Sequence, residues 1–184
     1  MFRFLSIAAL IITLVSCQKK VDPFRISLDS VGHLNKSTLV KDIRTIFSND
    51  SVVMRVAGDE FLGTSNNIEI YDKEGNPLLS LERSEAFDSI ATIKTVQILD
   101  PRFKTEKGFG LSSTFKELKE QYALGKITNT LSLALVNIDT IGAYIGINKK
   151  ELPKNLLFDT NSKIEVHQIP DEAAIKYLWL DWSE

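Results

Sequence analysis

The chain has 184 residues, of which 43% are hydrophobic and 25% charged, with few prolines or glycines, as is typical of a folded globular protein. Its 22 lysine and arginine residues nearly balance its 24 aspartate and glutamate residues, for a net charge of −2. This balance argues against nucleic-acid binding, because neutralising phosphates takes a concentrated basic surface. With a single cysteine, the core must form from apolar side chains without disulfide bonds, which this length allows.

The first predicted element is a secretory signal segment, residues 1–16. Arg3 supplies a cationic start, residues 4–15 are mostly apolar, and polar residues follow from Gln18. The apolar run is shorter than the roughly 20 residues that a helix needs to cross a bilayer, which argues against a transmembrane anchor. Cys17 stands where a cleavage site would leave an ordinary residue.

The segment Leu14-Val15-Ser16-Cys17 resembles the lipobox of bacterial lipoproteins. This resemblance implies cleavage by signal peptidase II before Cys17, a diacylglyceryl group on its thiol and an acylated amino group. Two or three acyl chains hold a protein firmly on a membrane, since each buried methylene contributes about 0.8 kcal/mol. The residue after Cys17 is Gln18 and not the aspartate that is associated with retention in the inner membrane of some bacteria. Residues 18–20 also lack the acidic run that is associated with surface export in Bacteroidetes-type lipoproteins. By this resemblance we expect the periplasmic face of the outer membrane.

The folded part begins after the lipidated cysteine and a polar tether, residues 17–23, with a strand-like stretch at residues 24–28. Ser37 and Thr38 can then cap the start of a short helix. The helix has an apolar face with three- and four-residue spacing, formed by Val40, Ile43 and Phe47. Residues 49–50 end it.

Antiparallel strands follow this helix. Residues 51–56 have strand composition, and predicted strands at residues 67–71 and 78–81 flank a polar turn in which Gly75 can adopt a positive φ. Residues 91–98 alternate between apolar and polar side chains, as in a strand with one buried face.

The second half repeats this plan. Its helix begins at a possible capping box of Thr114 and Glu117 and aligns with the first helix, with Lys116 in the place of Lys41. The apolar faces of the two helices coincide in this alignment. Residues 131–137 and 141–148 supply the strands that follow.

The closing strands also match, because residues 91–98 align with residues 173–180. The helix and the closing strand are further apart in the second half, which predicts an insertion that we place at residues 151–162. The sequence therefore predicts an α+β fold of two tandem repeats, residues 24–101 and 102–184, each a short amphipathic helix with an antiparallel β-sheet. Two similar helices in a single α+β domain are the alternative, since short amphipathic helices can align by chance.

A helix followed by antiparallel strands, twice, resembles the tandem-repeat fold of the β-lactamase-inhibitor protein and the helix-plus-sheet unit of small outer-membrane-assembly lipoproteins. The segment from Gly110 to Tyr122 is also similar to one common in uncharacterised exported proteins of Bacteroidetes-type bacteria. These resemblances imply a non-enzymatic envelope protein. They imply no inhibitory or assembly residues, because no motif for either matches.

Known catalytic and ligand-binding motifs are missing from the sequence. There is no G-x-S-x-G, no H-E-x-x-H and no phosphate-binding glycine loop, and lipidation would consume the only thiol. His33 and His167 stand in unrelated segments without ligand spacing, so we predict no metal and no cofactor. Residues 72–76 lack the length and distal glutamate of a calcium loop. Asp50 with residues 59–60 could hold catalytic carboxylates, although acidic residues in polar connections are usually solvated.

The last strand carries the strongest candidate surface. Tyr177 and Trp179 fall on the face opposite Leu178 and Leu180, at positions where the first repeat has polar residues. If both halves bury the equivalent face, these two aromatic side chains stand on the open face, where such residues commonly anchor partners. The alternative is that they belong to the core, packed against the insertion or against the other repeat.

We therefore expect a membrane-anchored envelope lipoprotein that binds or scaffolds an envelope protein through Tyr177 and Trp179, and that is not an enzyme. The first alternative is a hydrolase of envelope polymers, which would use two facing carboxylates in a cleft. The second is a purely structural envelope protein with an evenly charged surface.

Overall fold

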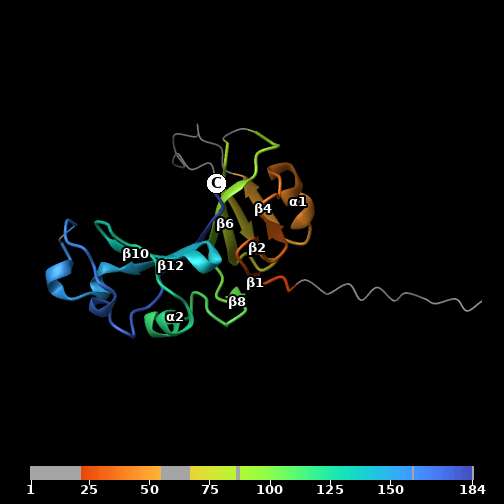
Figure 1. The fold of residues 1–184 in the computed structure, drawn as a ribbon. Helices are drawn as coiled ribbons and strands as arrows, with labels where there is room; N and C mark the ends of the chain where they lie inside the picture. Colours follow the sequence, from red (N-terminus) through yellow and green to blue (C-terminus); the bar gives the residue numbers. More distant parts are fainter. Residues whose placement is uncertain (1–21, 55–66, 86–87, 159, 184) are drawn as a thin grey trace, which may run out of the picture.

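The computed structural model describes residues 22–54, 67–85, 88–158 and 160–183 (Figure 1). Over these described residues, the fold is α+β and consists mostly of strands, with two short α-helices. The signal segment, Cys17 and the acidic residues 59–60 lie outside the described residues. Within the described ranges, no helix is long and apolar enough to cross a membrane.

Eight antiparallel strands form the main sheet, in the order β4-β5-β6-β7-β12-β11-β10-β9. In chain order these strands are β4 (Ser51–Met54), β5 (Asn67–Tyr71), β6 (Pro77–Arg83), β7 (Ile93–Ile98), β9 (Ile127–Asn129), β10 (Leu133–Ile138), β11 (Ala143–Asn148) and β12 (Tyr177–Asp181). Each half of the sheet is a meander of consecutive strands, and β7 pairs with β12 where the halves meet.

The hairpin predicted around Gly75 is confirmed. Strands β5 and β6 pair across the turn, in which Gly75 has a φ of 85°. The Asp72 carboxylate also accepts a hydrogen bond from the Asn76 backbone N–H at 2.8 Å. The turn is therefore closed by its own side chains and needs no bound calcium to explain it.

A second, smaller sheet was not expected from the sequence. It contains β1 (Arg25–Ile26), β2 (Ser30–Val31), β3 (Leu34–Asn35) and β8 (Lys104–Thr105), in the order β3-β2-β1-β8. Strand β1 lies in the stretch predicted at residues 24–28, and it pairs in parallel with β8 from the middle of the chain. Strands of two residues are too short to show an alternating pattern in the sequence.

The first helix is shorter than predicted and begins differently. It consists of a 3-10 turn, η1 (Val40–Asp42), followed by α1 (Ile43–Ile46). The expectation that Ser37 and Thr38 cap it was wrong, because the N-cap is Leu39 and no side chain bonds there. The hydroxyl of Thr38 instead accepts a hydrogen bond from the backbone N–H of Asn35 at 3.0 Å. These hydroxyls serve the preceding turn.

The second helix, α2 (Phe115–Gln121), has the predicted capping box. The Thr114 hydroxyl accepts a bond from the Glu117 backbone N–H, and the Glu117 carboxylate accepts one from the Thr114 backbone N–H at 2.7 Å. The rest of the second half contains the 3-10 turns η2 (Asp139–Ile141), η3 (Lys149–Glu151), η4 (Lys154–Leu156) and η5 (Val166–Gln168).

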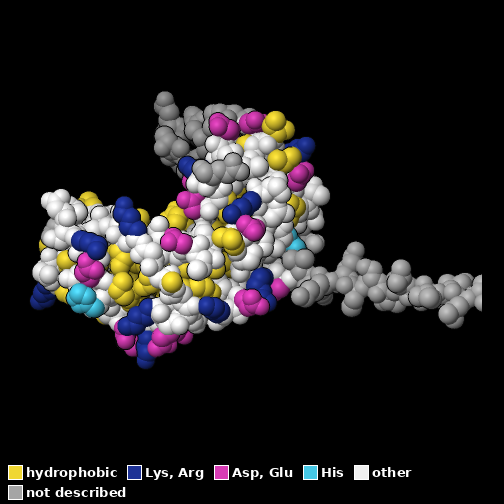
Figure 2. Space-filling view, viewed as in Figure 1, with side chains coloured by type: hydrophobic (Ala, Val, Ile, Leu, Met, Phe, Trp, Pro, Cys, Tyr) yellow, Lys and Arg dark blue, Asp and Glu magenta, His cyan; other side chains and the backbone are white. Residues whose placement is uncertain are grey.

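One face of the main sheet forms the core. Its side chains are almost fully buried, among them Ile68, Leu81, Val96, Ile145, Leu178 and Leu180. Ile43 of α1 and Phe115 and Leu118 of α2 are buried in the same core. Figure 1 shows the two halves of the sheet meeting at an angle, with α1 and α2 on the outer side of the bend, and Figure 2 shows a hollow on the inner side. We call the sheet face opposite the core the open face.

Candidate functional site

Tyr177 and Trp179 lie on the open face of the main sheet. They alternate along β12 with Leu178 and Leu180, which are both fully buried, whereas the two aromatic side chains are half-buried. The rings stack on each other, with centroids 4.9 Å apart and an interplanar angle of 29°. The structure thus puts both rings on the face expected for a partner-binding surface, and binding itself stays a prediction.

Tyr144 adds a third ring, which sequence reasoning missed. It lies on β11 opposite Trp179, and their ring centroids are 5.0 Å apart with an interplanar angle of 21°. We call Tyr144, Tyr177 and Trp179 the aromatic cluster. Alternation within residues 141–148 could have put Tyr144 on the open face, but only the pairing of β11 with β12 brings it to Trp179.

The cluster fits on the sheet because Gly146 has no side chain. A Cβ atom at this position would lie 3.1 Å from Trp179 Cζ3 and 3.1 Å from Tyr177 Cδ2. The two rings therefore lean over the glycine and fill the space that a side chain would occupy. A glycine inside a predicted strand was the available signal, since it often marks such a close approach.

Carboxylates flank the aromatic cluster on the same face. Asp181 of β12 pairs with Thr95 of β7, which pairs in turn with Glu82 of β6, so the three residues form one row across the sheet. Burial raises the pKa of Tyr144 above its ordinary value, and the negative charges of Asp181 and Glu82 raise it further. The field of both carboxylates therefore reaches the cluster.

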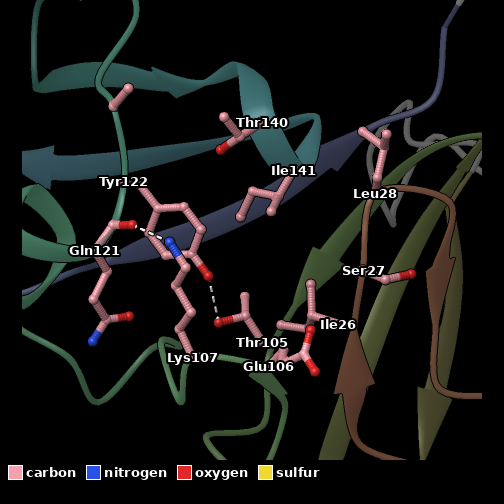
Figure 3. A pocket seen from close by; sticks show the side chains of 11 residues that line it. Ile26, Ser27, Leu28, Thr105, Glu106, Lys107, Gln121, Tyr122, Thr140 and Ile141 are labelled. Carbon is pink, nitrogen blue, oxygen red and sulfur yellow. Dashed lines mark hydrogen bonds between the residues drawn. The ribbon is translucent and has the colours of Figure 1, made fainter.

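A separate cavity of about 370 Å³ lies between the small sheet, the end of α2 and η2 (Figure 3). The Lys107 ammonium lies 4.6 Å from the centroid of the Tyr122 ring and donates a hydrogen bond to the Gln121 backbone carbonyl. The Tyr122 hydroxyl is 2.7 Å from the Thr105 hydroxyl oxygen. Figure 3 shows the Gln121 side chain pointing away from the other lining residues. The Lys107 ammonium and the Tyr122 and Thr105 hydroxyls are thus bound within the junction, whereas the Gln121 side-chain oxygen is buried without a hydrogen-bond partner among the described residues.

Two other carboxylates are held by one arginine. Arg102 donates hydrogen bonds to Asp100 from Nε at 3.0 Å and from Nη2 at 2.7 Å, and also from Nη2 to Asp72 at 3.2 Å. The hydrogen bonds from Arg102 hold the pKa of Asp100 below its ordinary value. This ion-pair network connects the β5–β6 turn to the segment after β7, which favours a structural role for both carboxylates over acid–base catalysis.

The two histidines are exposed and lie in different elements. His33 is in the turn between β2 and β3, and His167 is in η5. Over the ranges that the structure describes, no three histidine, cysteine, aspartate or glutamate residues group so as to hold a metal ion.

The chain thus has the fold of an α+β protein with a large antiparallel sheet and a small second sheet. No protein-family model matches its sequence, and no curated protein matches it. Among solved structures, it is similar to the uncharacterized protein YfeY from Escherichia coli, with a TM-score of 0.52 and 12% sequence identity. The match covers 85% of this chain and 99% of that chain. At this identity, the likeness concerns the fold alone.

Proposed function

We propose that this chain is a membrane-anchored lipoprotein of the bacterial envelope that binds another envelope protein through the open face of its main sheet. Lipid on Cys17 holds it at the periplasmic face of the outer membrane, and it has no catalytic activity, metal or cofactor. The signal segment and the lipobox support the anchor. The aromatic cluster supports the binding role.

The aromatic cluster is the observation that carries the binding proposal. Full burial of one large apolar side chain contributes about 1.5–3 kcal/mol, so aromatic residues normally enter the core. Three of them here are half-buried, on the face that α1 and α2 leave uncovered. Tyrosine and tryptophan are also the residue types that most often dominate the binding energy of protein interfaces. Their position on the inner side of the bend suits a convex partner surface.

We also propose that the two halves are tandem repeats, each a short helix followed by a four-stranded meander. The start of each helix donates two backbone hydrogen bonds to the segment that leads into the closing strand of its own half. These four bonds run from Val40 to Ala91, from Lys41 to Ser89, from Phe115 to Ala173 and from Lys116 to Asp171. The donors correspond to one another in the alignment of the two helices, and the acceptors correspond in the alignment of the two closing strands.

The pairing of β7 with β12 supports the same symmetry. Ile98 pairs with Leu178, and Val96 pairs with Leu180. In the alignment of the closing strands, Val96 corresponds to Leu178 and Ile98 corresponds to Leu180. Exchanging the two halves therefore turns the pair Ile98–Leu178 into the pair Leu180–Val96. Trp179 pairs with its own counterpart, Gln97. Trp179 is therefore next to the pseudo-twofold axis that this arrangement defines.

A cross-linked affinity pull-down from envelope membranes tests the binding role. The native lipoprotein is compared with a Tyr177→Ala, Trp179→Ala double variant whose circular dichroism and unfolding transition show that it is folded. Phe158→Ala is the matched control, because this side chain is 90% exposed and lies outside the cluster. We expect a partner that the native protein and the control capture and the double variant loses. Capture of the same partners by all three would contradict the proposed site.

A further inference from the structure

We infer that the partner presents an arginine side chain to the open face, where its guanidinium contacts the aromatic cluster and pairs with Asp181 beside it. This inference rests on the proposed function, and it names the chemistry of the partner surface. The partner is thus a protein with a basic, convex patch.

The charges on the open face supply the first argument. By strand register, the carboxylates of Glu69, Glu82 and Asp181 all lie on this face. Lys94 is a cation beside them, with its Nζ 3.4 Å from Glu82 Oε1. Asp181 accepts hydrogen bonds from its neighbour Ser183, and no lysine or arginine within the described ranges forms an ion pair with it. Since Lys94 pairs with Glu82, Asp181 is the carboxylate beside the aromatic cluster with which a cation of the partner can still pair.

The position of Asp181 supplies the second argument. It follows Trp179 by two residues on the same face of β12, and its charge acts on the Tyr144 hydroxyl. A partner group that covers the rings therefore also removes water from this carboxylate. A neutral or anionic group would leave the carboxylate desolvated without a counter-charge, which is costly. A cation satisfies the carboxylate and the rings together.

The rings already accept a cation from within the chain. Lys176 Nζ lies 5.1 Å from the centroid of the Tyr177 ring, within the range of a cation–π contact. Arginine fits the neighbouring position better than lysine, because its planar guanidinium can stack on an aromatic ring and bind a carboxylate through two N–H groups at once.

Fluorine NMR of the mature lipidated protein in detergent, labelled with fluorotryptophan, tests this inference. The chain has two tryptophans. Trp179 reports on the cluster, and Trp182, which is only 6% exposed, serves as an internal control. The probes are N-acetylarginine amide and its neutral isostere, N-acetylcitrulline amide. We expect arginine amide to bind the cluster at least about threefold more tightly than citrulline amide, as one cation–π contact predicts, and to leave Trp182 unshifted.

Two variants and one further probe complete the test. Asp181→Asn should weaken arginine binding because it removes the carboxylate partner, while the cation–π contact with the rings keeps part of the preference over citrulline. Glu120→Gln, an exposed change on α2, should leave arginine binding unchanged. Equal binding of both amides to the native protein, or undiminished arginine binding by Asp181→Asn, would overturn the inference. A Trp179 shift caused by a neutral chito-oligosaccharide in place of arginine amide would also overturn it and assign the face to glycans.

The pull-down separates this inference from the proposed function. A partner that depends on Tyr177 and Trp179 but is captured equally by Asp181→Asn would support the proposed function and overturn the arginine inference. Selective arginine binding without any captured partner would support the chemistry of the face and contradict the binding role.

Discussion

Trp179 faces Gln97 across the central strand pair of the main sheet, so the largest side chain of the open face lies where the two halves meet. Tyr144 and Tyr177 stack against it, and Gly146 leaves the space that Trp179 and Tyr177 occupy. The cluster thus depends on two strands, β11 and β12, which belong to the second half of the chain. The corresponding positions of β7 carry Thr95 and Gln97, so Tyr177 and Trp179 have no aromatic counterparts on β7.

If the cluster serves binding more than folding, truncating it should cost little stability. We expect Trp179→Ala to lower the free energy of unfolding by about 1 kcal/mol or less, against about 2–5 kcal/mol for Leu178→Ala, which opens a cavity in the core. Urea unfolding of both variants measures the difference. Equal losses would show that Trp179 is a core residue and would weaken the binding proposal.

Gly146→Val should disrupt the cluster while keeping all three rings. Its side chain would enter the space where Trp179 and Tyr177 already lie 3.1 Å from the Cβ position, so the rings must move. We expect a changed fluorine spectrum for Trp179, weaker partner capture and a stability loss of about 1–3 kcal/mol from overpacking. An unchanged Trp179 signal would show that the rings do not depend on this glycine.

The Asp100–Arg102 pair should make stability depend on pH in the acidic range. Because the pKa of Asp100 is lowered in the folded state, its contribution is fully present above the unfolded value of about 4 and is lost as pH falls through the folded value. We expect Asp100→Asn to cost about 1 kcal/mol at neutral pH, a modest figure because the Arg102 side chain is 50% exposed, and to flatten the acid decline in unfolding free energy.

Urea titrations from neutral to acidic pH measure this effect. Asp29→Asn is the control, since this carboxylate forms an ion pair with Lys36 but its side chain is 72% exposed. A native-like acid decline in Asp100→Asn would contradict the prediction.

The two helix starts should respond differently to the loss of a hydroxyl. Thr114→Ala removes half of the capping box of α2 and should lower the free energy of unfolding by about 1 kcal/mol. Ser37→Ala should change it by less than about 0.5 kcal/mol, because Ser37 does not cap the first helix. Similar losses in thermal unfolding would instead favour the capping role that the sequence predicts for Ser37.

Cys17→Ser should abolish membrane attachment, since the lipobox resemblance implies lipid on this thiol. We expect the native protein to fractionate with membranes and to carry the added mass of a diacylglyceryl group and an acyl chain. The variant should lack both the added mass and the membrane association. A native protein of unmodified mass would contradict the proposed anchor.

The sequence by itself determined the features that depend on neighbouring residues. The hairpin around Gly75, the capping box of Thr114 and Glu117 and the alternation along β12 all follow from interactions within a few residues. The helix start at Ser37 and Thr38 was wrong for the same local reason, because a hydroxyl can serve a turn as well as a helix.

Only the tertiary structure decided which distant segments lie together. The pairing of β1 with β8 and the meeting of Tyr144 with Trp179 join residues far apart in the chain, and no local pattern specifies either partner. Strand pairing is chosen by the burial of a whole face, so the aromatic cluster forms only once β11 and β12 have paired and buried their opposite face in the core.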